Sequence, residues 1–434
     1  MRVIVDRRPD FGYDFPERTR QLKQTHTEVQ GRMSRTGKAR MMRILPAVLA
    51  AVMMIAFLPD GTAEEAPAAV VKNQDNTWLG TSGISSPDIP ADKDTPWSGS
   101  YVYFGSYNGS PVRFRVLAKD STDYTSGKSL FLDSDATLFN GCFDHTSPYC
   151  NAWDVSDIRT ILNGTFLDCF DVCEKAAISV STGNGKRFYA SGSAESVAFG
   201  TPVCVDDKVF LLDIADVLNE AYGYSSDSGW IYHEKGVWDW YPVGNHKKSG
   251  TFNCWWLRSA GFEGNSNHTG AVDNVGNFYG ANVRYATIGV APALNIGQDC
   301  ILFTTSVGAE ANEFKLTLID SDLTVTIPDG INIVVEGTSV SIPYEIGGPD
   351  ADDATRISVL ILDREYSAGN TGSASIIYYS SLGSTLDGIG TFDLPAGCSP
   401  DGWESDYRVY ILAEIIRGPY ETDYASAPVA VSSP

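Results

Sequence analysis

The chain has 434 residues, with 32 basic and 54 acidic side chains, so its formal net charge is −22. A chain of this length is expected to form roughly two or three domains. Its hydrophobic fraction of 43% excludes a disordered chain. The acidic balance excludes a nucleic-acid-binding protein, because phosphate recognition needs a basic face. The same charge favours a dispersed, soluble protein.

The first segment of the chain predicts an export signal. Residues 1–40 form a polar leader. The basic residues Arg35, Lys38, Arg40 and Arg43 precede an apolar run from Ile44 to Leu58, and small residues follow at Gly61 and Ala63. This apolar run is too short for a membrane-spanning helix, which needs about 20 residues. We therefore expect residues 41–63 to be a signal peptide that is cut after Ala63.

The position of this signal raises a question about the start of translation. Because a signal normally begins close to the initiator, Met33 or Met41 is interpreted as the true start and the upstream stretch as a mis-set one. The alternative is a cytoplasmic extension on a membrane anchor. Removal of residues 1–63 takes away 11 basic and 6 acidic residues and leaves a net charge of −27. We expect the mature chain outside the cell or at its surface, without a stable membrane span.

The rest of the chain is expected to contain a linker and two domains. Residues 64–95 are rich in Ala, Pro, Ser, Asp and Gly, which predicts a flexible linker. Residues 96–300 are interpreted as one domain, in which strands and short helices are expected. One hairpin is expected around Asn108-Gly109, since this dipeptide favours a two-residue turn between strands. Helices are expected near 156–163, 166–177 and 214–222.

The C-terminal part has a different pattern. Residues 301–313 are interpreted as a connector, and residues 314–434 contain short apolar runs separated by Gly, Pro, Asp and Ser. The runs lie at 314–319, 323–327, 338–346, 356–362, 375–379, 389–394, 407–416 and 427–432. Such spacing predicts an all-β, Ig-like β-sandwich.

A series of short motifs in residues 100–296 resembles a bacterial domain family of unknown function, DUF6273. The motifs, in order, are Phe104-Gly105-Ser106-Tyr107, Arg115-Val116-Leu117, Trp153 with Ser156-Asp157-Ile158-Arg159, Leu162-Asn163, Val209-Phe210-Leu211-Leu212, Trp256-Leu257-Arg258-Ser259 and Gly289-Val290-Ala291-Pro292-Ala293-Leu294. This family looks distantly similar to the C-type-lectin-like fold of formylglycine-generating enzymes. The resemblance implies a compact α+β domain with a closing β-hairpin region and long irregular loops.

The aromatic loop 230–241 is the main binding candidate. Its side chains Trp230, Trp238, Trp240 and Tyr241 offer ring faces on which sugars can stack. The alternative is that these rings cover a small core of the loop itself. Arg258 is a further ligand-binding candidate, with a structural ion pair as its alternative, because a buried Arg normally has a partner.

All eight cysteines follow the predicted signal. An exported chain permits disulfides, and the candidate pairs are Cys142 with Cys150 and Cys254 with Cys300. The alternative is a set of free buried thiols. Cys142, His145 and Cys150 have the spacing of metal ligands, but an exported chain favours a disulfide, so we expect no metal.

No set of nucleophile and base is recognisable in the mature chain, so we expect no catalytic residues and no cofactor. The expected function is a secreted or cell-surface binding or display protein that recognises a glycan or a surface protein. One alternative is an exported enzyme that uses Cys254, as the resemblance to formylglycine-generating oxidases implies. The other is a structural spacer, since sandwich modules extend a chain stiffly.

Overall fold

The structure, a computed structural model, describes most of the chain after residue 75. The described residues are 76–92, 95–146, 149–183, 186–188, 194–196, 204–224, 241–242, 254–260, 267–273, 277–308, 312–368, 374–383 and 388–434. They belong to one compact unit, Glu65–Pro434. The leader and signal predicted at 1–63 lie outside the described residues.

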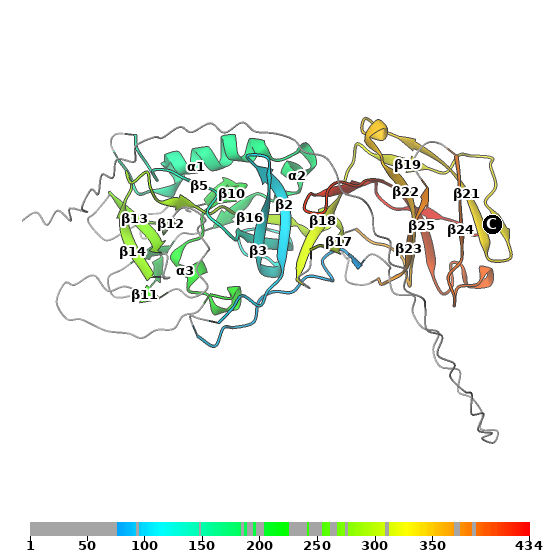
Figure 1. The fold of residues 1–434 in the computed structure, drawn as a ribbon, viewed down its shortest axis with the longest axis horizontal. Coiled ribbons are helices and arrows are strands. Elements are labelled where there is room, and N and C mark those ends of the chain that lie inside the picture. Colours follow the sequence, from blue (N-terminus) through cyan, green and yellow to red (C-terminus); the bar gives the residue numbers. More distant parts are fainter. Residues whose placement is uncertain are drawn as a thin grey trace, which may run out of the picture. The chain divides into compact units, whose positions relative to one another are not determined.

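The expected α+β, lectin-like fold class is wrong, because the described residues form a mostly-β structure. Strands hold 46% of them and helices 13%. Figure 1 shows the three α-helices in the blue-to-green part of the chain, whereas the yellow-to-red part consists mainly of strands. The expected helices exist but are short, since residues such as Gly164 (φ −117°, ψ −106°) leave the helical conformation after one or two turns.

Among the described residues, the largest sheet has thirteen strands. Its main path runs through β10 (Val209–Phe210), β16 (Ala293–Gly297), β4 (Ser129–Ser134), β3 (Ser110–Ser121), β2 (Tyr101–Tyr107), β18 (Glu313–Ile319), β26 (Asp423–Ala425), β25 (Arg408–Ile415), β22 (Arg356–Leu362) and β23 (Ile376–Gly383). Three more strands join at its sides, namely β1 (Thr77–Leu79), β17 (Ile301–Ser306) and β27 (Val429–Val431). The predicted hairpin joins β2 to β3, with positive φ at Asn108 (52°) and Gly109 (74°).

Strand β18 connects the two regions that the sequence separates. Along the edge opposite to β17, it pairs in parallel with β2 through residues 313–315 and with β26 through residues 317–319, so hydrogen bonding continues across the expected boundary. The stretch 301–313, expected as a connector, contains β17, which pairs with β18. Parallel pairing of strands far apart in sequence leaves no local signal, since periodicity identifies a strand and not its neighbour.

A second sheet of six strands lies in the predicted α+β region. Its order is β11 (Tyr241–Pro242), β14 (Asn277–Asn282), β13 (His268–Asp273), β12 (Cys254–Ala260), β15 (Gly289–Val290) and β5 (Phe139–Asn140). Strand β5 is therefore an edge strand, paired only with β15 within the described part. Two pairs of short strands complete this region, β6 (Ser181–Gly183) with β9 (Cys204–Asp207) and β7 (Lys186–Phe188) with β8 (Ala194–Ser196).

The C-terminal part consists of strands at the expected positions. A four-stranded sheet contains β19 (Thr324–Thr326), β20 (Val334–Glu336), β21 (Ser339–Gly347) and β24 (Gly388–Asp393). Its inward side chains, such as Val340 and Ile342, share one core cluster with Val359 of β22 and Ile411 of β25. Residues 314–434 thus contribute to two packed sheets, while the Ig-like relationship stays a prediction.

The helical segments lie mainly between β5 and β11. The α-helices are α1 (Asp157–Ile161), α2 (Val172–Ala177) and α3 (Ile214–Val217). The 3-10 turns are η1 (Trp153–Val155), η3 (Leu167–Cys169), η4 (Glu220–Tyr222), η5 (Gln298–Cys300), η6 (Ala351–Asp353) and η7 (Pro400–Gly402), and η2 (Leu162–Phe166) is a wider π-helical turn. No helix in the described ranges is long and apolar enough to cross a membrane.

The predicted flexible linker, 64–95, is partly built into the fold. Its strand β1 pairs with β17, and Leu79 is only 2% exposed. Leu79 lies in a second core cluster with Phe303 of β17 and Leu360 of β22. The high Ala, Pro and Gly content of 64–95 led to the prediction of a linker. The burial of Leu79 offsets the entropy cost of ordering the backbone around it.

Candidate functional site

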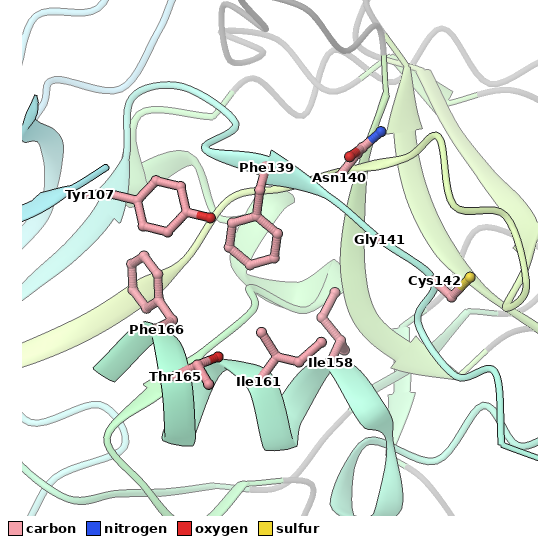
Figure 2. Close-up of a pocket in the computed structure, with 9 residues that line it drawn as sticks. All are labelled: Tyr107, Phe139, Asn140, Gly141, Cys142, Ile158, Ile161, Thr165 and Phe166. Atoms are coloured by element: carbon pink, nitrogen blue, oxygen red, sulfur yellow. The ribbon is translucent and has the colours of Figure 1, made fainter. Parts of the chain in front are cut away.

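A pocket of about 300 Å³ opens between the α1–η2 segment and the edge strand β5. Figure 2 shows side chains from both elements facing each other across it. Its lining residues are Tyr107, Phe139, Asn140, Gly141, Cys142, Ile158, Ile161, Thr165 and Phe166. We call this set the aromatic pocket. Its volume lies at the lower end of the range for small-ligand sites, about 300–1,000 Å³.

The helical side of the pocket is fixed by a local capping signal. The Ser156 hydroxyl accepts a hydrogen bond of 3.3 Å from the Arg159 amide and donates one of 2.9 Å to the Trp153 carbonyl. This cap starts α1, which buries Ile158 and leaves Ile161 40% exposed. The wide turn η2 then follows and carries Thr165 and Phe166.

Three aromatic rings meet at one end of the pocket. The ring centroid of Tyr107 lies 5.6 Å from that of Phe139 and 5.6 Å from that of Phe166, and the last two are 6.2 Å apart. Phe166 is buried, whereas Tyr107 and Phe139 are half-buried. These tilted rings stabilise one another while part of their surface remains open. The three come from β2, β5 and η2, so their meeting depends on the tertiary fold.

The polar groups of the pocket are uncharged. The lining contains the Tyr107 hydroxyl, the Thr165 hydroxyl and the residue Asn140, whose side chain points away from the cavity in Figure 2, and no Asp, Glu, Lys, Arg or His. The strand side is held in place by the carbonyl of Gly141, which accepts a 2.7 Å hydrogen bond from Nε1 of Trp256. At the far end, Sγ of Cys142 lies 3.2 Å from the Arg284 carbonyl and donates to it. The pocket is therefore an apolar, neutral environment within an acidic chain.

Arg258, expected as a ligand-binding candidate, is a buried structural residue. Its side chain is fully buried, with Nη2 3.1 Å from Oδ2 of Asp213 and Nη1 3.1 Å from Oδ2 of Asp216. Nη2 also donates a 2.7 Å hydrogen bond to the Tyr124 hydroxyl, which donates to Asp216 at 2.6 Å. The alternative of a structural pair is thus the correct one, because a guanidinium with these partners has no free surface for a ligand.

We call Arg258, Tyr124, Asp213 and Asp216 the Arg258 cluster. With both carboxyl groups ionised, it would hold two negative charges and one positive charge. Burial and, to a smaller extent, the neighbouring carboxylate of Asp213 together raise the pKa of Asp216 to about 7, although Arg258 opposes the shift. A single guanidinium cannot neutralise two buried carboxylates, so the pair retains a proton most readily at Asp216. The cluster joins α3 to β12 and serves stability.

The expected disulfides do not form in the structure, where all eight cysteines are free. The loop between Cys142 and Cys150 is instead closed by Asp144, whose carboxylate accepts a 2.6 Å hydrogen bond from the Cys150 amide. Cys254 lies in β12 of the six-stranded sheet, whereas Cys300 ends η5 before β17 of the large sheet. Sequence spacing cannot reveal this, since the two strands belong to different sheets.

His145, weighed as a metal ligand with Cys142 and Cys150, pairs with a carboxylate. Its Nδ1 lies 2.5 Å from Oδ2 of Asp157 at the start of α1. No group of three or more metal-ligating side chains occurs in the part of the chain that the structure describes.

The predicted aromatic binding loop falls largely outside the described residues, which include none of Trp230, Trp238 and Trp240. Tyr241 starts β11, whose backbone pairs with β14 at Phe278. The aromatic pocket was missed by sequence reasoning. Its one available signal was the Asn108-Gly109 turn, which places Tyr107 at a strand end but gives no hint of Phe139 or Phe166.

Residues 127–298 match the model of a family described as a domain of unknown function, DUF6273. This match confirms the family resemblance for that range, which contains every pocket residue except Tyr107. Similarity to the lectin-like fold is not supported, given the mostly-β structure. No curated protein and no solved structure matches the chain.

Proposed function

We propose that this chain is a non-catalytic binding protein that acts outside the cell or at its surface, with its ligand site in the aromatic pocket. The observation that carries the proposal is the meeting of Tyr107, Phe139 and Phe166 around an open cavity of about 300 Å³. Sites for small ligands are concave and mostly apolar, with a few polar groups that fix orientation. The pocket has this composition, and Figure 2 shows the three rings grouped at one end.

Export is the part of the proposal that rests on the sequence. A basic stretch followed by the apolar run Ile44–Leu58 and Ala63 supports a removable signal peptide. A strongly acidic mature chain supports a protein that stays dispersed after release. The ligand would then be a glycan or a surface protein met outside the cell.

The enzyme alternative, based on Cys254, has less support. Burial raises the pKa of the Cys254 thiol, and the Tyr279 hydroxyl lies within hydrogen-bonding reach. A raised pKa disfavours the thiolate, which is the nucleophilic form. Cys300, the predicted partner, belongs to a different sheet region and does not supply a second reactive thiol.

The spacer alternative is favoured by one observation for the C-terminal part. Because β18 pairs with both β2 and β26, the C-terminal strands continue the sheet of the preceding region. We propose that the C-terminal part gives the preceding region rigid support, while the aromatic pocket of that region binds the ligand.

A matched pair of surface variants tests the proposed function. Ile161→Lys places a hydrated cation at the pocket rim, whereas Val172→Lys makes the same change at a 79% exposed site on α2. The full chain and both variants are applied to a glycan array and to pull-downs with surface proteins. We expect ligands that are retained by the wild type and Val172→Lys and lost by Ile161→Lys. Ligands retained equally by all three would place binding elsewhere and contradict the proposal.

A further inference from the structure

Two hydroxyl groups face the aromatic pocket, those of Tyr107 and Thr165. Within the described part of the chain, neither the Tyr107 hydroxyl nor the Thr165 hydroxyl makes a hydrogen bond. Thr165 is exposed and Tyr107 is half-buried, so water satisfies both hydroxyls in the free protein. Each can exchange that water for a ligand hydroxyl.

These groups lie around an apolar floor. Figure 2 shows Tyr107 at the aromatic end and Thr165 on the helical side, whereas the Asn140 side chain points away from the cavity on the strand side. Ile158 and Ile161 continue the apolar surface along the helix. A fitting ligand therefore has an apolar face toward the rings and several hydroxyls around its edge.

Charge narrows the ligand class further. The lining offers no cation to pair with an acidic ligand, and the chain carries a net charge of −22. A carboxylate or phosphate in this pocket would lose hydration without gaining a counter-charge. A cationic ligand would find no carboxylate in the lining either.

We infer that the aromatic pocket binds a neutral pyranose ring, which stacks one C–H face on Tyr107 and Phe139 and exchanges hydrogen bonds with the hydroxyls of Tyr107 and Thr165. This inference rests on the proposed function and names its ligand class. Pyranosides combine an apolar C–H face with a ring of hydroxyls, which is the complement of this lining. A purely apolar ligand would leave the two hydroxyls desolvated and unpaired.

The test measures binding of four small probes to the full chain by calorimetry and ligand-observed NMR. Methyl glucopyranoside and methyl galactopyranoside are neutral sugars, methyl glucuronide adds a carboxylate, and cyclohexylmethanol keeps an apolar ring with one hydroxyl. The variants Tyr107→Phe and Thr165→Val each delete one hydroxyl at nearly constant shape. Ile161→Lys obstructs the rim, and Val172→Lys is its surface control.

We expect at least one neutral pyranoside to bind the wild type and Val172→Lys, and to lose binding in Ile161→Lys. Each hydroxyl deletion should weaken this binding by roughly two- to tenfold, as for loss of one hydrogen bond. Methyl glucuronide should bind at least roughly tenfold more weakly than the matching neutral sugar, since its charge has no partner.

Other outcomes overturn the inference in distinguishable ways. Binding of cyclohexylmethanol that is sensitive to Ile161→Lys, without pyranoside binding, would reject the sugar and leave the pocket as a binding site. Equal binding of glucuronide, or no effect of both hydroxyl deletions, would also reject the inferred ligand class. Absence of binding by every probe, together with arrays and pull-downs that do not respond to Ile161→Lys, would reject the proposed function as well.

Discussion

The Thr422 hydroxyl donates a 2.6 Å hydrogen bond to Oε1 of Glu174, a carboxylate 248 residues earlier in the chain. Glu174 lies in α2, where its other oxygen accepts the Asp171 amide at 3.0 Å as part of a capping box. The Gly105 amide also donates to Glu174 at 3.1 Å. One buried carboxylate thus connects α2, β2 and the segment that leads into β26.

This connection predicts that the C-terminal strands stabilise the preceding region. In Thr422→Val, the buried Glu174 carboxylate loses one of its donors, and we expect the free energy of unfolding to fall by about 1–3 kcal/mol. Urea unfolding followed by circular dichroism measures the change. Thr326→Val, at an exposed position of β19, is the control and should stay within about 0.5 kcal/mol of the wild type. Equal stability of Thr422→Val and the control would contradict the connection.

The N-terminal strand gives a second stability prediction. Leu79 packs with Leu302 and Phe303 in the second core cluster, so Leu79→Ala should destabilise the chain by about 2–5 kcal/mol. The comparison is Ile89→Ala, because Ile89 is 66% exposed and its loss should be nearly neutral. Thermal and urea unfolding of both variants measure this difference in stability. An unchanged free energy of unfolding in Leu79→Ala would contradict this packing and favour the original prediction of a linker for residues 77–79.

How far the sequence predicts the fold depends on whether the signal is local. All eight apolar runs predicted after residue 313 correspond to strands. Each strand has its own local signal, since it is an apolar run bounded by turn residues. The Asn108-Gly109 hairpin was predicted for the same reason. The parallel pairing of β18 with β2 and β26 was not predicted. It joins residues that are about 100 to 200 positions apart in the sequence, such as Thr317 with Asp423 and Glu313 with Tyr101.

The candidate site shows the same division. A helix was expected near 156–163, and α1 begins there. Arg258 was given a structural ion pair as its alternative, and the structure contains that pair. The rings of Phe139 and Phe166 gave no signal, because isolated aromatics in a sequence are usually core residues. Only the tertiary packing of β5 against η2 leaves an open pocket between them.

The Arg258 cluster predicts a specific pH dependence. Burial raises the pKa of Asp216 from 3.8 to about 7, so the folded state holds a proton that the unfolded state releases. Stability should therefore fall as pH rises from about 4 to about 7, with a slope of up to about 1.4 kcal/mol per pH unit from this group. Asp216→Asn cannot release that proton and should lack this part of the slope.

Urea unfolding of the wild type and Asp216→Asn at several pH values gives the difference. Asp135 does not interfere in this window: burial raises its pKa, but Arg115 and Arg113 outweigh that effect and lower it, so its contribution is lost only at more acidic pH. Parallel stability curves for the two proteins between pH 4 and pH 7 would contradict a protonated Asp216.

The cysteines offer a chemical prediction. The structure contains eight free thiols, so the chain denatured without reductant should react with eight equivalents of a thiol reagent. In the folded chain, exposed Cys169 should react first. Cys204 should react last, since it is buried and burial raises its pKa to about 12. A count of four thiols, with peptide mapping of Cys142–Cys150 and Cys254–Cys300 bridges, would restore the original disulfide prediction.

The central claim is that a ligand ring lies against the aromatic rings between β5 and η2. The most direct measurement is an NMR experiment that detects nuclear Overhauser effects between a bound methyl pyranoside and assigned side chains of the full chain. We predict contacts from the sugar C–H protons to the rings of Tyr107 and Phe139, and their loss in Ile161→Lys. Contacts confined to other parts of the protein, or no contacts at a saturating sugar concentration, would contradict the claim.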